Sequence, residues 1–167
     1  MTEQLDWNDI VKDVGPSLLR YFSASFPHSI ASDLVQEVFI RLVKKHRQGE
    51  YDQQKGSLRM FSFGIAHYVR LEAIKAAPVE DYFAEVTDYD SRVNDGFASD
   101  QHRERLLQLR QAIGTLNEHE KQIILLHIDN ELTLVEISSI IKAPIGTVKS
   151  HVHRAKEKLK ARLLSQE

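Results

Sequence analysis

Apolar residues recur with helical spacing along most of this chain, and no segment alternates as a half-buried strand does. The clearest stripe, at i, i+1, i+4, i+5, i+8 and i+9, is formed by Leu34, Val35, Val38, Phe39, Leu42 and Val43. Ser32 or Asp33 is expected to cap that helix, which should end near Lys45. Helices are also expected over about Trp7–Ala24 and Leu58–Lys75. The first 76 residues are therefore predicted to be all-helical.

The second half of the chain carries explicit helix-start signals. After a helix over about residues 103–113, Asn117 with Glu120 resembles a capping box that opens a helix to about residue 128. Thr133 with Glu136 resembles a second one, which opens a short helix with buried Leu134, Ile137, Ile140 and Ile141. Pro144 is expected at the first position of a last helix, which ends near Leu164.

Two helices with a three- or four-residue break between them, the second one basic, are typical of a helix-turn-helix. The stripe that the last helix should bury is Val148, Val152, Ala155, Leu159 and Leu163. Roughly opposite lie Thr147, Ser150, His151, Arg154 and Lys158, with Lys149, His153, Lys156 and Lys160 on the flank. Short polar side chains could reach base edges and the lysines could reach phosphates, so this helix is predicted to bind DNA. The alternative is a solvated basic face.

Charge is distributed unevenly, although the 167 residues sum to only −2. Residues 77–101 hold seven acidic side chains and one basic one, whereas residues 142–162 hold seven basic and one acidic. The acidic segment has Pro78 and Gly96 and no clear apolar period, which favours a linker. We predict an all-α fold of two small helical domains, residues 1–76 and 102–167, joined by an acidic linker over residues 77–101.

Composition excludes several classes of protein. The absence of cysteine rules out a disulfide scaffold, a thiolate zinc site and a cysteine nucleophile, and it suits a reducing cytoplasm. The longest strictly aliphatic run has four residues, so no membrane insertion is expected. The acidic start does not resemble a signal peptide, and a soluble, cytoplasmic protein is expected.

An enzyme is the first rival interpretation, because eight histidines invite a metal or acid–base site. However, His151 and His153 diverge on a helix and cannot chelate together. The sequence has no glycine-rich phosphate loop, no HExxH and no nucleophile elbow. We therefore expect no catalytic residue, no metal site and no cofactor.

A family resemblance makes the prediction specific. The segment "LNEHEKQIILLHIDNELTLVEISSIIKAPIGTVKSHVHRAKEKLK" (Leu116–Lys160) resembles promoter-binding region 4 of the sigma-70 superfamily. The segments "DLVQEVFIRLVKK" (Asp33–Lys45) and "GSLRMFSFGIAHYVRLEAIK" (Gly56–Lys75) resemble region 2 and the helix that follows it. Two such regions alone are typical of the small extracytoplasmic-function (ECF) group. The resemblance implies a bacterial sigma factor that binds core RNA polymerase, recognises −35 DNA and melts −10 DNA. An anti-sigma protein holds many relatives, but no residue here indicates one.

The resemblance also assigns residues to each partner. The residues that it implies for −35 DNA are Thr147, Lys149, Ser150, His151, Arg154, Lys156 and Lys158. Those implied for −10 DNA are Lys55, Ser57, Arg59, Phe63, His67 and Arg70. Those implied for the polymerase clamp are Asp33, Gln36, Glu37, Ile40 and Arg41. Core packing is the alternative for Phe63 and Tyr68, and a lone exposed aliphatic is the alternative for Ile40. The linker is either a flexible connector or a mimic of nucleic acid in the polymerase cleft.

Some positions depart from the family pattern. Only Lys75 stands where relatives often carry a run of arginines, so −10 contacts are expected to be weaker or to have another preference. Lys142 replaces the glycine common at the turn, which would cost on the order of 1 kcal/mol if this residue is left-handed. Two further rivals stay open. One is a response regulator, whose receiver would contain strands, and the other is a sigma-like adaptor that binds polymerase but not DNA.

Overall fold

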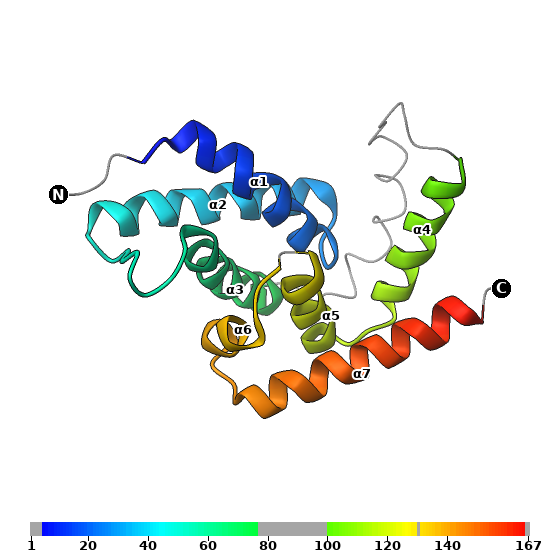
Figure 1. Cartoon of the computed structure of the whole chain (residues 1–167). Coiled ribbons are helices and arrows are strands. Elements are labelled where there is room, and N and C mark those ends of the chain that lie inside the picture. The colour runs from blue at the N-terminus through cyan, green and yellow to red at the C-terminus, as the bar shows by residue number, and fades with distance from the viewer. Residues whose placement is uncertain (1–4, 77–99, 130, 166–167) are drawn as a thin grey trace. The chain divides into compact units, whose positions relative to one another are not determined.

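The computed structural model describes residues 5–76, 100–129 and 131–165, and all secondary structure within these ranges is helical (Figure 1). The chain divides between Ala84 and Glu85 into two compact units. Most of the expected linker, residues 77–99, lies outside the described residues, but Asp100 and Gln101 already belong to a helix. The all-α prediction is confirmed.

The first unit contains α1 (Trp7–Ser23), α2 (His28–Arg47) and α3 (Leu58–Ala76). The side chain of Asp6 caps α1 by accepting hydrogen bonds from the backbone N–H groups of Asn8 and Asp9. The expected N-cap of α2 at Ser32 or Asp33 is wrong by five or six residues. Pro27 is the N-cap residue with an extended backbone, and because a helix start needs no N–H from that position, α2 begins directly after it.

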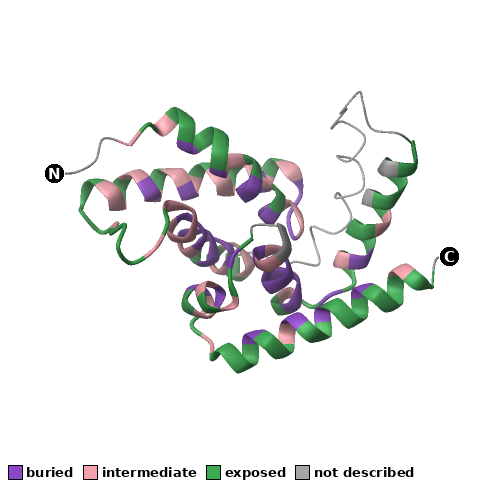
Figure 2. Cartoon of the chain, viewed as in Figure 1, coloured by how far each residue is buried: buried purple, intermediate pink, exposed green. Residues whose placement is uncertain are grey.

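Aromatic rings form the centre of the first unit. Tyr21, Phe22, Phe26 and Phe63 are almost completely buried. Figure 2 colours the buried residues of the chain purple. The rings of Tyr21 and Phe63 meet edge to face, with centroids 5.6 Å apart, and this contact joins α1 to α3. Residues 5–76 contain no strand in this structure. A response regulator would have a receiver domain with strands, so the structure contradicts that rival interpretation.

The second unit contains α4 (Asp100–Gly114), α5 (Glu118–Ile124), a π-helical turn η2 (Leu125–Asp129), α6 (Leu134–Ile141) and α7 (Ile145–Leu164). Both capping boxes are confirmed, at Asn117 with Glu120 and at Thr133 with Glu136. The four predicted stripe residues from Val148 to Leu159 are buried, and Leu163 packs partly buried at the edge of the core. The apolar cluster that joins α4, α5 and α7 consists of Ala112, Leu116, Ile124, Ala155 and Leu159.

A tight turn joins α6 to α7. Lys142 is left-handed, with φ 54° and ψ 46°, and its backbone N–H bonds to the carbonyl of Ser138. The hydroxyl of Ser138 donates to the carbonyl of Ala143 at 2.6 Å, which closes the turn. Pro144 is the N-cap residue and not the first helical residue as expected, so α7 starts one residue later. No helix within the described ranges is long and apolar enough to cross a membrane.

The left-handed backbone of Lys142 leads to a stability prediction. Lys142→Gly should raise the free energy of unfolding of the second unit by about 0.5–1 kcal/mol, because glycine adopts this conformation without the steric cost of a Cβ atom. Hydrogen exchange of the α6 and α7 amides measures this change. Lys142→Ala is the matched control, since it removes the side chain but keeps the Cβ, and it should give no gain. Equal protection in the two variants would contradict the backbone explanation.

Candidate functional site

One face of α7 presents polar and basic side chains to solvent. Six of the seven residues predicted to bind DNA there are exposed: Thr147, Lys149, Ser150, Arg154, Lys156 and Lys158. This face stays exposed in the folded chain because the core contacts the other side of the helix, where Val148 and Val152 are buried. Ser150 donates its hydroxyl to the carbonyl of Gly146 at 3.0 Å, and its oxygen remains an acceptor on the exposed face. This exposed face of α7 can contact both base edges and phosphates.

Lys158, the sixth predicted residue, is bound to another helix. Its Nζ lies 2.9 Å from each carboxylate oxygen of Glu120 on α5. Glu120 is only 1% exposed. Burial raises the pKa of Glu120, but the hydrogen bonds from Lys158 and from the backbone of Asn117 outweigh burial and leave the pKa below its usual value. The pair therefore joins α5 to α7.

His151, the seventh, is half-buried against the same helix. Its ring stacks on His119 of α5 with centroids 6.1 Å apart, and its Nδ1 is buried without a hydrogen-bond partner. Burial lowers the pKa of His151, and the charges of Arg154 and His119 lower it further. Within the described ranges no three histidine or acidic side chains are grouped as metal ligands. His151 thus presents part of its ring to the exposed face of α7.

The residues predicted for −10 DNA are divided by the fold. Lys55 and Ser57 are exposed, whereas Phe63, His67 and Arg70 are buried and Arg59 is half-buried. The prediction that Phe63 offers its ring to a base conflicts with this structure, because its ring fills the core against Tyr21. His67 and Arg70 are likewise covered, with 8% and 3% of their surface exposed.

Arg59 is engaged within the first unit. Its guanidinium donates to the hydroxyl of Ser17 at 3.1 Å and lies 3.3 Å from both the carbonyl and a carboxylate oxygen of Asp13. Arg59 therefore fixes α3 to α1. No local pattern in the sequence indicates this role, because the partners belong to a helix more than forty positions away.

Tyr68 was not assigned to a site, yet it is the aromatic residue of α3 that the fold exposes, at 44%. It lies on the helix face that also carries Gly64, where an added Cβ would meet nothing within 4 Å. An exposed ring beside open space is a platform on which an unpaired base could stack. The sequence carries a signal for this position: Ser57, Phe61, Gly64 and Tyr68 are spaced at i, i+4, i+7 and i+11, which places the four residues on one helix face.

The predicted polymerase surface is also divided. Asp33, Gln36 and Ile40 are exposed on α2, and Ile40 is 63% exposed. Arg41 instead donates to Glu37 at 2.7 Å and to both carboxylate oxygens of Glu72 on α3, at 3.0 and 2.6 Å. The hydrogen bonds that Arg41 donates to Glu72 and Glu37 raise the pKa of Arg41, and the same contact lowers the pKa of Glu72. Arg41 thus joins α2 to α3 through Glu72, and Glu37 on its own helix holds the guanidinium in place.

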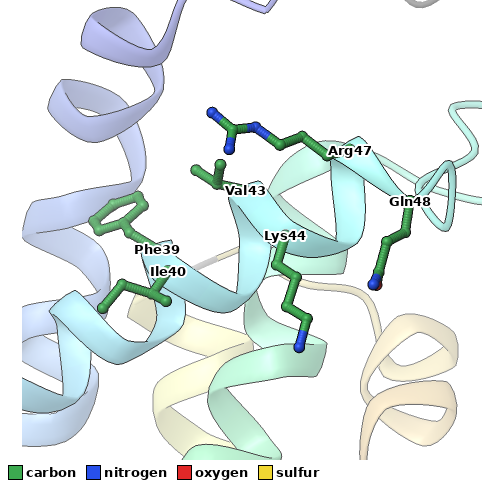
Figure 3. Close-up of a pocket in the computed structure, with 6 residues that line it drawn as sticks. All are labelled: Phe39, Ile40, Val43, Lys44, Arg47 and Gln48. Carbon is green, nitrogen blue, oxygen red and sulfur yellow. The ribbon is translucent and has the colours of Figure 1, made fainter.

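An open groove continues this surface along α2. Its lining residues, drawn in Figure 3, are Phe39, Ile40, Val43, Lys44, Arg47 and Gln48. Three of the six side chains are apolar and two are basic, which suits a partner with an apolar and acidic surface. The ring of Phe39 lies close to Gly15 of α1, where an added Cβ would make an ordinary van der Waals contact with it at 3.8 Å. The groove adds Phe39, Val43 and Lys44 to the candidate docking surface.

Comparisons with known proteins agree with this arrangement. The family model described as "Sigma-70, region 4" matches residues 106–159, which include the turn and most of α7. The "ECF RNA polymerase sigma factor SigW" of Bacillus subtilis (strain 168) is 29% identical over 143 residues, which span 80% of this chain and 75% of that protein.

Two solved structures share the fold. The sigma factor RpoE in complex with the anti-sigma factor NepR from Bartonella quintana gives a TM-score of 0.68 at 23% identity, over 97% of this chain and 99% of that chain. The structure of CnrH in complex with the cytosolic domain of CnrY gives a TM-score of 0.66 at 18% identity, over 96% of this chain and 88% of that chain. Because both sequence identities are low, the structural similarity establishes a shared fold and not a shared function.

The environment of His151 leads to a pH prediction. Because its pKa is lower in the folded chain than the ordinary 6.5, the unfolded chain binds more protons, and stability falls as the pH drops below 6.5. His151→Gln should remove part of this loss. Urea unfolding followed by the resonances of α7, below and above pH 6.5, measures it. His153→Gln, an exposed histidine on the same helix, is the control and should keep the wild-type pH dependence; an identical effect of both variants would contradict the assignment.

Proposed function

We propose that this chain, an ECF-type sigma factor of the sigma-70 superfamily with a role in transcription initiation, binds core RNA polymerase and directs it to promoters through separate −35 and −10 contacts. The observation that carries the proposal is the capped α6, the left-handed turn and the exposed basic face of α7, inside the segment that matches region 4. The polymerase supplies the chemistry in this scheme, and the chain selects the DNA. Such an activity belongs in the cytoplasm.

Recognition of −35 DNA is assigned to α7. Thr147, Ser150 and Arg154 lie on the exposed face near its N-terminus, where side chains of a recognition helix reach base edges. Lys149 and Lys156 are exposed on the flank and meet phosphates. The ring of His151 lies between the residues assigned to base edges and those assigned to phosphates. Lys158 binds Glu120 and is not assigned to DNA.

Contacts with −10 DNA are assigned to the loop before α3 and to one face of that helix. Lys55, whose side chain is 85% exposed, supplies charge for the backbone, and Ser57 lies beside it at the helix start. Tyr68 replaces Phe63 as the ring on which an unpaired base stacks. Arg59, Phe63, His67 and Arg70 support this surface from within the unit.

Docking on core polymerase is assigned to α2. Asp33, Gln36 and Ile40 form its exposed part, and the groove from Phe39 to Gln48 extends it. We also infer an anti-sigma protein as a partner, since RpoE was solved in complex with one and has the same fold.

An adaptor that binds polymerase but not DNA is the remaining rival. Runoff transcription with core polymerase on a genomic fragment library separates the two. Discrete transcripts that depend on this chain support a sigma factor, and polymerase binding without transcripts supports the adaptor.

The docking assignment predicts the behaviour of a double variant. Gln36→Ala with Ile40→Glu removes a hydrogen-bonding group and places a charge in the middle of the contact, so affinity for core polymerase should fall at least about tenfold. Binding is measured by competition for core enzyme, and circular dichroism checks that helicity is unchanged. Val11→Glu is the control, because it adds the same charge at an exposed apolar position of α1. Normal binding by the folded double variant would refute the assignment.

The −35 assignment predicts two kinds of effect. Ser150→Ala and Arg154→Ala should relax the preference at one promoter position and cost about 1–3 kcal/mol, because each removes a contact with a base edge. Lys156→Ala should weaken binding to all sequences alike and reduce the salt slope by about one. Binding of the holoenzyme to a randomised −35 library at two salt concentrations distinguishes the two kinds. Unchanged profiles in the first two variants would mean that α7 only positions the protein.

A further inference from the structure

We propose that Glu120 is a positioning residue for −35 recognition: its buried carboxylate fixes the orientation of α7 through Lys158 and keeps that lysine away from DNA phosphates. The proposal rests on the proposed function of α7. It gives a role in DNA recognition to an acidic residue that lies on another helix and touches no DNA.

The carboxylate of Glu120 is held from two sides. Within α5 it belongs to the capping box, since the backbone N–H of Asn117 donates to Oε2 at 3.3 Å and the N–H of Glu120 donates to Asn117 at 2.8 Å. From α7, Nζ of Lys158 donates to both carboxylate oxygens at 2.9 Å. A group that is fixed at the start of one helix therefore fixes a point in the middle of another.

The position of Lys158 makes this tether relevant to recognition. Residues 147, 151, 154 and 158 are spaced at i, i+4, i+7 and i+11, so they share one face of α7. A tether at Lys158 therefore sets the rotation of α7 about its own axis, and with it the direction of Thr147 and Arg154. The apolar cluster with Ala155 and Leu159 holds the other side of α7, and the two hydrogen bonds from the Lys158 ammonium group add a polar contact with a preferred geometry.

Charge explains why DNA does not capture Lys158. A phosphate that drew the ammonium away would leave the carboxylate of Glu120 buried without its cation, which is strongly unfavourable. Exposed Lys149 and Lys156 carry no such cost. Glu120 thus separates the basic residues of α7 into one structural tether and several phosphate contacts.

Glu120→Gln tests this role without destroying the cap, because glutamine also completes a capping box. The holoenzyme is bound to a preferred −35 site and to its single-base variants at several salt concentrations, with the active fraction measured by titration. We expect discrimination among the sites to fall about threefold. The released Lys158 should also steepen the salt slope by about one.

Glu157→Gln is the matched control. It removes the same charge from an exposed position next to Lys158. The affinity for DNA should therefore rise by the same factor at every site, while discrimination among the sites stays at the wild-type level. If Glu120→Gln behaves in the same way, Glu120 acts only through its charge and the proposal is overturned.

Substitutions of Lys158 provide the second test if Glu120→Gln folds poorly. Lys158→Met should reduce discrimination but leave the salt slope as in the wild type, and Lys158→Arg should restore discrimination. Intact discrimination with a slope reduced by about one in Lys158→Met would make Lys158 a phosphate contact and overturn the proposal. Failure of the wild-type holoenzyme to discriminate −35 sites at all would instead refute the proposed function.

Discussion

Burial of one apolar stripe per helix is the constraint on which both units depend. Each unit is built from a few amphipathic helices, so each helix has one face for the core and another that stays at the surface. In α7, Val148 and Val152 are buried while Ser150 and Arg154 on the other side remain exposed. In α2, Val38 and Leu42 occupy the core and Ile40 is left in solvent. The surfaces that we propose for partners are the faces that the core does not use.

Charged residues at the edges of the core then divide into two groups. Arg41, Arg59 and Lys158 each hold two helices together, through Glu72, through Asp13 and Ser17, and through Glu120. Lys156 is exposed, and Lys55 pairs only with Asp52 of its own loop, at 3.9 Å, so neither of the two joins helices in this way and both are proposed to contact phosphates. A substitution in the first group is therefore expected to change orientation and stability, whereas one in the second group changes affinity alone.

The same division changes the interpretation of α3. Phe63 was a candidate for stacking on a base because of its residue type, but a ring that meets Tyr21 edge to face in the core cannot do so in this conformation. Tyr68 has the same chemistry and lies on the exposed side. The position of an aromatic side chain on the helix surface decides between packing and recognition.

The sequence by itself determined the helical character of the chain, both capping boxes and the buried stripe of α7, because these depend on interactions within a few residues. The family resemblance made Lys142 a candidate for a left-handed position, because relatives commonly carry glycine at the turn, and the structure shows that Lys142 adopts this conformation. Only the tertiary structure decided which basic residues are tethers, since their partners lie on other helices. It likewise decided that Phe63 is core, that Tyr68 is exposed and that Glu120 is buried beneath α7. Local signals fix where a helix begins, whereas the use of each face depends on the neighbour that covers it.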